Sequence, residues 1–107
     1  MTTVKYDKET ECIMIYLPKE VDHHEVGDLK DKTEKILETE KVHYMVFDFS
    51  RTEFMDSSGI GAMMGRYKRI YRQGGEVLVC GLSDRIRRIL KLSGIFRIVK
   101  EVEMVEG

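Results

Sequence analysis

The 107-residue sequence has only two cysteines and no long apolar segment, and both absences narrow the class of protein. No apolar run approaches the roughly 20 residues that span a bilayer, and the N-terminus lacks the pattern of a signal peptide. Cys12 and Cys80 lie inside apolar, strand-like runs without metal-ligand spacing, which favours buried thiols in a reducing compartment over a disulfide. We therefore expect a soluble protein of the cytoplasm.

An excess of charge of either sign is also absent. The chain has 18 lysines and arginines against 19 aspartates and glutamates, so no overall field attracts nucleic acid or an anionic membrane, and neither is expected as a partner. Linkers, internal repeats and low-complexity segments are missing, and 107 residues suffice for one hydrophobic core. The sequence therefore predicts a single domain that covers residues 1–107.

Motifs for nucleotide or metal binding are missing as well. Neither a Walker pattern nor Gly-x-Gly-x-x-Gly occurs, so no nucleotide cofactor is expected. His23 and His24 are adjacent and should point in different directions on a helix, and His43 is remote in sequence, so no metal site is expected.

The apolar periodicity alternates between strand-like and helix-like segments. The first two strands are close in sequence, which predicts an antiparallel pair with the first strand at an edge. The later strands are separated by helices, which predicts parallel neighbours joined by right-handed crossovers. Predicted strands cover residues 3–6, 12–17, 43–49, 76–80 and 96–99, and predicted helices cover roughly residues 22–40, 56–73 and 83–94. The expected fold is α/β, a small, mostly parallel mixed sheet of about four to five strands with three or four helices packed on it.

The stretch from Phe54 to Gly61 lies where a buried strand leads into a helix, which is where open α/β sheets place their chemistry. It contains two adjacent serines, preceded by Asp56 and followed by two glycines. A helix start presents unpaired N–H groups, so Asp56 and Ser57 could cap it, or it could hold a phosphate on one of the serines. Gly59 and Gly61 would let the backbone of another protein approach closely. Spacing alone leaves both interpretations open.

The residues from Phe54 to Gly61 resemble the phosphorylation-site motif of the anti-sigma factor antagonists, or anti-anti-sigma factors, which have the STAS fold. The similarity covers nearly the whole chain and is closest to the members that act on the sporulation sigma factor F. Further segments match in order and at compatible spacings, namely Gly65-Arg66-Tyr67-Lys68, Gly74-Gly75-Glu76-Val77, Val79-Cys80, Leu92-Ser93-Gly94-Ile95-Phe96 and, upstream, Val21-Asp22-His23-His24.

The resemblance implies roles for individual residues. The first serine of the motif, Ser57, would be phosphorylated, and Ser58 would shape the helix start. Asp56 would orient the loop and offer a hydrogen bond to the partner kinase. Asp22 matches the acid that follows the second strand, and in a parallel sheet its loop and that of Ser57 emerge at the same end; a simple helix cap is equally open for Asp22. The partner-binding face would comprise Asp22, Asp56, Ser58, Gly59 and Gly61.

Two residues near Asp22 also bear on this face. Glu25 stands three residues after Asp22, in capping-box position. Family members often have glycine just before Glu20, where this chain has Lys19, a long cation that bears on partner specificity. Family members also often continue with a further helix after the last strand, which this chain is expected to lack or to shorten.

As the resemblance implies, the protein would be a regulator and not an enzyme, without a cofactor or a catalytic residue of its own. Unphosphorylated protein would bind an anti-sigma factor that is also a serine kinase, and so release the sigma factor for transcription. The kinase, with its own ATP and Mg²⁺, would phosphorylate Ser57 and eject the product, and a serine phosphatase would reset the switch. The protein is expected to be a monomer.

Two alternatives stay open. The chain could be a STAS scaffold or signalling module in a stress-response assembly, or a small ligand-binding α/β protein. A serine hydrolase is disfavoured because Asp-Ser-Ser-Gly lacks the glycine two residues before the serine that a nucleophile elbow uses. A receiver domain is disfavoured because its acidic pair is missing, although Asp48 stands near the position of a phosphorylated aspartate.

Overall fold

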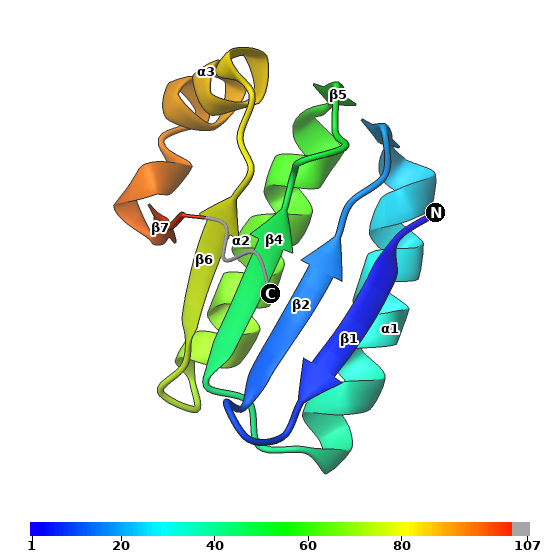
Figure 1. Ribbon diagram of the computed structural model, residues 1–107, viewed down its shortest axis with the longest axis vertical. Helices are drawn as coiled ribbons and strands as arrows, with labels where there is room; N and C mark the ends of the chain where they lie inside the picture. Colours follow the sequence, from blue (N-terminus) through cyan, green and yellow to red (C-terminus); the bar gives the residue numbers. More distant parts are fainter. Residues whose placement is uncertain (104–107) are drawn as a thin grey trace.

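The computed structural model describes residues 1–103, and its largest feature is a five-stranded mixed sheet. The strands lie in the order β1-β2-β4-β6-β7 (Figure 1). β1 is antiparallel to β2 at one edge, and all other neighbours are parallel, which confirms the predicted α/β sheet. The strands are β1 (Thr3–Asp7), β2 (Cys12–Tyr16), β4 (Tyr44–Asp48), β6 (Glu76–Cys80) and β7 (Val99–Glu101).

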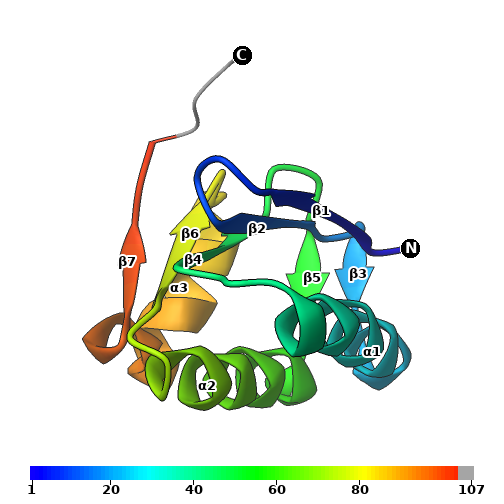
Figure 2. The same ribbon diagram turned by 90° about the horizontal axis from the view of Figure 1, so that it is seen from below.

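Three α-helices pack against this sheet. Helices α1 (His23–Thr39) and α2 (Ser57–Tyr71) lie side by side on one face, as Figure 2 shows. Helix α3 (Asp84–Ser93) lies beyond the carboxyl end of β6, and the hydroxyl of Ser83 accepts a hydrogen bond from the Ile86 N–H at 3.1 Å, as an N-cap should. Within residues 1–103, no helix combines the length and the apolar character needed to cross a membrane.

The hydrophobic core fills the space between the sheet and the two parallel helices. Alternate strand residues face the helices and are buried, and burial of such apolar surface is the dominant stabilising contribution. The fully buried side chains include Ile13, Ile15, Met45, Phe47 and Val79 from the sheet and Leu29, Met63, Ile70 and Leu90 from the helices. Cys12 and Cys80 are free thiols; Cys80 is buried and Cys12 is half-buried.

A second, very short parallel ladder was not predicted from the sequence. Strand β3 (Glu20–Val21) pairs with β5 (Phe54–Met55) outside the main sheet, with Glu20 opposite Phe54 and Val21 opposite Met55. Two residues are too few for an alternating pattern, so this ladder leaves no periodic signal. Its position matters because each of its strands leads directly into a helix.

The last predicted strand, at residues 96–99, was placed too early. A 3₁₀ helix, η1 (Ile95–Arg97), occupies the first half of that range, and β7 begins only at Val99. Gly94 ends α3 in the left-handed conformation, with φ of 78°, and the chain makes one further turn before Val99 reaches its partner Val77. The expected lack of a further helix concerns mainly residues 104–107, which lie outside the described part of the chain.

Candidate functional site

The starts of α1 and α2 lie next to each other, as expected for loops at the same end of a parallel sheet. The β3–β5 ladder places Val21 opposite Met55, so the residues that follow them, Asp22 and Asp56, are brought together. The Asp56 N–H also donates to the Val21 carbonyl at 3.3 Å. Asp22 is the N-cap of α1 and Asp56 is the N-cap of α2. The start of α1 therefore lies beside Asp56, the residue directly before Ser57.

The carboxylate of Asp56 is held in place by the helix that it caps. Its Oδ1 accepts a hydrogen bond from the Ser58 N–H at 2.9 Å and another from the Ser58 hydroxyl. The hydrogen bond from the Ser58 hydroxyl is the main reason that the pKa of Asp56 lies below its usual value. The N–H groups of Ser58 and Gly59 and the nearby His23 lower this pKa further. Asp56 is consequently ionised at neutral pH, with its charge next to Ser57.

The two serines differ sharply in accessibility. Ser58 is half-buried, and its hydroxyl donates to Asp56. Ser57 is the first residue of α2 and is exposed, and its hydroxyl has no hydrogen-bond partner within residues 1–103. Of the pair, Ser57 is therefore the hydroxyl that a kinase could reach without first breaking a side-chain hydrogen bond.

Of the two interpretations of this helix start, the structure contains the cap, which Asp56 provides. Asp56 already engages the first N–H groups of α2, through its carboxylate at Ser58 and its carbonyl at Gly59, the latter at 3.1 Å. A phosphate on Ser57 would have to displace this cap to reach those donors. Its charge would otherwise remain at the outer surface, beside Asp22 and Asp56, where an approaching protein meets it.

Asp22 acts as a cap, but the predicted capping box does not form. Its Oδ1 accepts from the Glu25 N–H at 3.1 Å, whereas the Glu25 carboxylate accepts a hydrogen bond from the Thr2 hydroxyl at 3.0 Å. The expected divergence of His23 and His24 is also wrong, because their rings stack with centroids 5.4 Å apart. No cluster of three or more metal-ligating side chains occurs within the described residues.

The two glycines of the motif have opposite environments. Gly61 is exposed, and a Cβ atom at that position would meet nothing within 4 Å. Gly59 is buried, and a Cβ there would lie 2.6 Å from the Sδ atom of Met55. The expectation that Gly59 opens the surface to a partner therefore needs correction, because its missing side chain makes room for Met55 beneath the helix. Of the two glycines, only Gly61 is exposed for the proposed contact with a partner.

The same substitution should have opposite effects at these two positions. Gly59→Ala should destabilise the fold by about 1–3 kcal/mol, because the new methyl group overlaps Met55. Gly61→Ala, two residues along the same helix, should stabilise it by about 0.5–1 kcal/mol, because alanine favours a helix where space is free. Thermal unfolding followed by circular dichroism measures both, and shifts of the melting temperature in the same direction would refute this assignment.

Phe54 and Lys19 border the helix starts. Phe54 has no role in the sequence analysis beyond its place in the motif, yet its side chain is 49% exposed. The Lys19 carbonyl accepts hydrogen bonds from the N–H groups of Glu53 (2.8 Å) and Phe54 (3.1 Å), and the Lys19 ammonium pairs with the Glu53 carboxylate at 3.3 Å. The positive charge of Lys19 is thus partly neutralised by Glu53, and Phe54 adds an apolar contact surface near Ser57.

A partly buried ion pair joins α1 to α2 behind the site and was not predicted from the sequence. The Arg66 side chain on α2 is only 9% exposed, and its Nη1 lies 2.8 Å from Oε1 of Glu34 on α1. Arg69 reaches the other oxygen of Glu34 at 3.3 Å. The hydrogen bond from Arg66 is the main reason that the pKa of Glu34 lies below its usual value. The sequence does contain a sign of this pair, because Arg66 lies among the buried apolar residues of α2 and therefore needs an acidic partner.

Known proteins share both this sequence and this geometry. Residues 3–106 match the profile of the STAS domain family. The chain is 33% identical over 87 residues to the anti-sigma F factor antagonist of Paenibacillus polymyxa, covering 81% of this chain and 74% of that protein. It is 28% identical over 101 residues to the anti-sigma-B factor antagonist of Listeria monocytogenes, covering 94% and 87%.

Solved structures agree with these sequence matches. The anti-sigma factor antagonist SpoIIAA in its unphosphorylated form superposes with a TM-score of 0.86 and 25% identity, over 99% of this chain and 90% of that one. The phosphorylated form of the Bacillus protein superposes with a TM-score of 0.77 at the same identity, over 99% and 93%. The chain therefore belongs to the STAS domain family and, within it, to the anti-sigma factor antagonists.

Proposed function

We propose that the unphosphorylated protein binds an anti-sigma factor that is also a serine kinase, and that this binding frees a sigma factor for transcription. The contact face is formed by the adjoining starts of α1 and α2, with Asp22, Asp56, Ser58 and Gly61 around Ser57. One observation carries the assignment of the switch: of the two serines, only Ser57 has an exposed hydroxyl without a side-chain hydrogen bond. The kinship with anti-sigma factor antagonists supports the identity of the partner.

Phosphorylation of Ser57 ends the interaction by charge. The modification adds about −1.5 to −2 charges at pH 7, beside two carboxylates that already cap the neighbouring helices. Because Asp56 occupies the first donors of α2, the new charge is directed at the partner and not absorbed by the fold. The release therefore requires no large conformational change.

The other components of the proposed cycle are partner proteins. In this proposal the protein has no catalytic activity and no cofactor of its own, and the kinase supplies ATP and Mg²⁺. A serine phosphatase restores the active form, and the cycle runs in the cytoplasm with the protein as a monomer. The relatives include antagonists named for both sigma F and sigma B factors, so the proposal leaves the sigma factor unspecified.

Intact-mass analysis with peptide mapping tests the proposal. The protein is incubated with ATP and the anti-sigma kinase from the same genome, and we expect one added phosphoryl group, located on Ser57. The Ser57→Ala variant should gain none, and Ser58→Ala should still gain one. Addition on Ser58, or no addition, would overturn the assignment of Ser57 and favour another role for the domain, such as a scaffold in a stress-response assembly.

A further inference from the structure

Helix α3 carries an exposed charged surface at the same end of the molecule as Ser57. Figure 1 shows α3 beyond the carboxyl end of the sheet, beside β5. The two elements are in contact, and Met55, the last residue of β5, stands two positions before Ser57. A protein bound at the starts of α1 and α2 therefore has α3 as an immediate neighbour.

One side of α3 is buried and the other is cationic. Ile86 and Leu90 pack into the hydrophobic core. Arg85, Arg88 and Lys91 are exposed, and their spacing of three residues places them on one side of the helix. None of these three cations forms an ion pair with a carboxylate within residues 1–103. We call these three residues the basic face of α3.

The acidic side chains closest in sequence to this face are engaged elsewhere. Arg87 lies 3.4 Å from Oδ1 of Asp84 through Nη1 and 2.7 Å from Oε2 of Glu101 through Nη2. Leu92 stands four residues after Arg88, on the same side of the helix, and is 82% exposed. The basic face thus keeps its three positive charges and includes a protruding apolar side chain.

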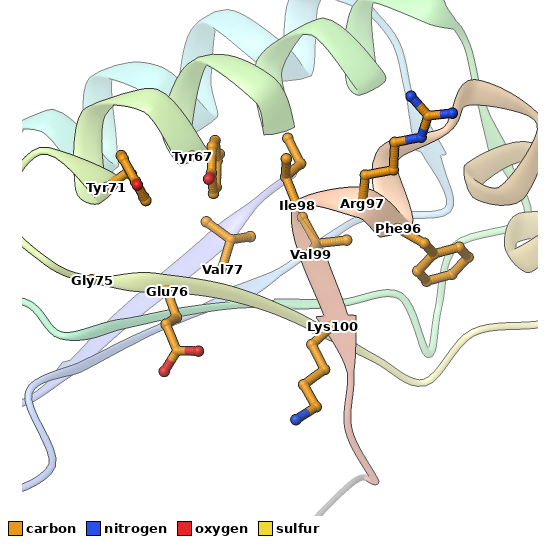
Figure 3. A pocket seen from close by; sticks show the side chains of 10 residues that line it. All are labelled: Tyr67, Tyr71, Gly75, Glu76, Val77, Phe96, Arg97, Ile98, Val99 and Lys100. Atoms are coloured by element: carbon orange, nitrogen blue, oxygen red, sulfur yellow. The ribbon is translucent and has the colours of Figure 1, made fainter.

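Lys100, a further exposed cation, does not belong to this face. Figure 3 shows its side chain with that of Glu76 on the side of the sheet opposite to Tyr67 and Tyr71 of α2. Lys100 therefore shares its surface with an acidic residue. The basic face of α3 has no such acidic companion apart from Asp84, which pairs with Arg87.

We propose that the basic face of α3 is part of the surface that binds the anti-sigma factor, and that it meets an acidic surface of that protein. This inference rests on the proposed function and specifies the chemistry of the partner. Carboxylates of the partner would pair with Arg85, Arg88 and Lys91, and an apolar side chain would pack on Leu92. Charge complementarity of this kind directs the encounter and fixes the register of an interface.

The size of the molecule favours a single partner for both surfaces. Its principal extents are 34 × 27 × 26 Å, and the longest is vertical in Figure 1, so the end with Ser57 and α3 measures 27 × 26 Å. A stable interface buries roughly 800 Å² on each protein, which corresponds to a patch roughly 30 Å across. A partner centred on the start of α2 would therefore also cover α3.

An acidic partner surface also fits the expected effect of phosphorylation. In the unphosphorylated protein, the three cations of α3 attract the carboxylates of the partner. A phosphate on Ser57 adds about −1.5 to −2 charges at the same end of the molecule, which opposes most of this attraction. The same acidic surface is thus attracted before the modification and repelled after it.

Three other occupants fit the basic face less well. The apolar side of α3 is buried in the core, so it is not available for insertion into a membrane surface. Affinity for nucleic acid grows with the number of phosphates neutralised, and this face offers three cations close to the carboxylate of Asp56. A second copy would bring like charges together, because an isologous interface uses the same patch twice.

Charge reversal on α3 tests the proposal with the full chain and the purified anti-sigma factor. Arg88→Glu should weaken binding by about tenfold or more, because repulsion replaces attraction at the centre of the basic face. Lys8→Glu makes the same charge change at an exposed cation in the turn between β1 and β2, at the other end of the sheet (Figure 1), and should leave the affinity within about twofold. Circular dichroism checks that both variants are folded.

Two further measurements identify the contact as electrostatic. The affinity of the wild-type protein should fall more steeply with added salt than that of Arg88→Glu. Carbodiimide joins a lysine amine to a carboxylate in contact with it, so Lys91 should be crosslinked to an aspartate or glutamate of the anti-sigma factor. Peptide mapping by mass spectrometry locates the crosslink, and Lys8 should remain free. Phosphorylation of Ser57 should abolish the crosslink at Lys91.

Several outcomes would overturn the proposal. These are an unchanged affinity of folded Arg88→Glu, equal salt dependence of the two proteins, and crosslinks to the anti-sigma factor at Lys8 but not at Lys91. Binding to anionic vesicles or to an oligonucleotide that Arg88→Glu abolishes, with full binding of the anti-sigma factor, would identify another occupant of the basic face. A wild-type protein that does not bind the anti-sigma factor would instead refute the proposed function, so the two failures are distinguishable.

Discussion

Ser57→Asp should bind the anti-sigma factor at least about tenfold more weakly than the wild-type protein, whereas Ser57→Ala should bind with undiminished affinity. Aspartate places one permanent negative charge on the exposed first residue of α2, beside the carboxylates of Asp22 and Asp56. Alanine leaves the face neutral at that position and cannot be phosphorylated. The first variant therefore imitates the inactive form and the second is locked in the active form.

The electrostatic magnitude is sufficient for this result. A tenfold loss of affinity corresponds to about 1.4 kcal/mol. Two like unit charges about 4 Å apart repel by about 4 kcal/mol at an effective dielectric constant near 20. The repulsion between the new aspartate of Ser57→Asp and a single acidic residue of the partner would therefore exceed the roughly 1.4 kcal/mol that a tenfold loss of affinity requires. A phosphate carries a larger charge and would be repelled more strongly.

Isothermal titration calorimetry with the purified anti-sigma factor measures this difference. Ser58→Asp is the matched control, because it adds the same charge one residue further along, at a half-buried position whose hydroxyl normally donates to Asp56. It should destabilise the start of α2 in thermal unfolding, an effect that Ser57→Asp lacks. Equal affinities for Ser57→Asp and Ser57→Ala would refute the charge mechanism.

Glu34→Ala should lower the free energy of unfolding by about 1–3 kcal/mol, the usual cost of leaving a buried polar group without its partner. The Arg66 side chain is 9% exposed and would remain buried without the carboxylate of Glu34, whereas the Glu34 side chain is one-third exposed. Glu38→Ala, one turn further along α1 and exposed, is the matched control and should change the stability by less than about 0.5 kcal/mol. Urea denaturation at pH 7 measures both variants.

The pH dependence and a double variant check the cause. The pKa of Glu34 is lowered in the folded state, so its contribution is complete above the ordinary pKa of 4.5 and is lost as the pH falls through the lower folded value. The difference between wild type and Glu34→Ala should therefore narrow below pH 4.5. Replacing both partners, as Glu34→Leu with Arg66→Met, should restore most of the stability, because no buried charge remains. A double variant as unstable as Glu34→Ala would contradict this account.

The main sheet and the three helices could be predicted because each carries a long local pattern. Burial requires apolar residues along β2 and β4, and it requires them at helical spacing along α1 and α2. Both patterns can be recognised in the sequence. The β3–β5 ladder and the start of β7 could not be placed in this way. Their bounds depend on which distant residue each meets, as Val21 meets Met55 and Val99 meets Val77.

The candidate site shows the same division. The residue types of the motif indicated a helix start and a modified serine, and the resemblance selected Ser57. Three contacts of the site leave no local pattern in the sequence and became visible only in the structure: Ser58 donates to Asp56, Gly59 packs on Met55, and Glu34 pairs with Arg66, which is 32 residues further along the chain.

The brevity of the β3–β5 ladder has a consequence for the proposed modification of Ser57. The ladder itself has only two residue pairs and lies outside the five-stranded sheet, so its hydrogen bonds can open at a free energy below that of global unfolding. Amide hydrogens of Phe54 to Ser57 should accordingly exchange with solvent much faster than those of β4. In the proposed cycle, a kinase or phosphatase would use this local opening to take the serine segment into its catalytic cleft, and Met55 would return to the core when the enzyme leaves.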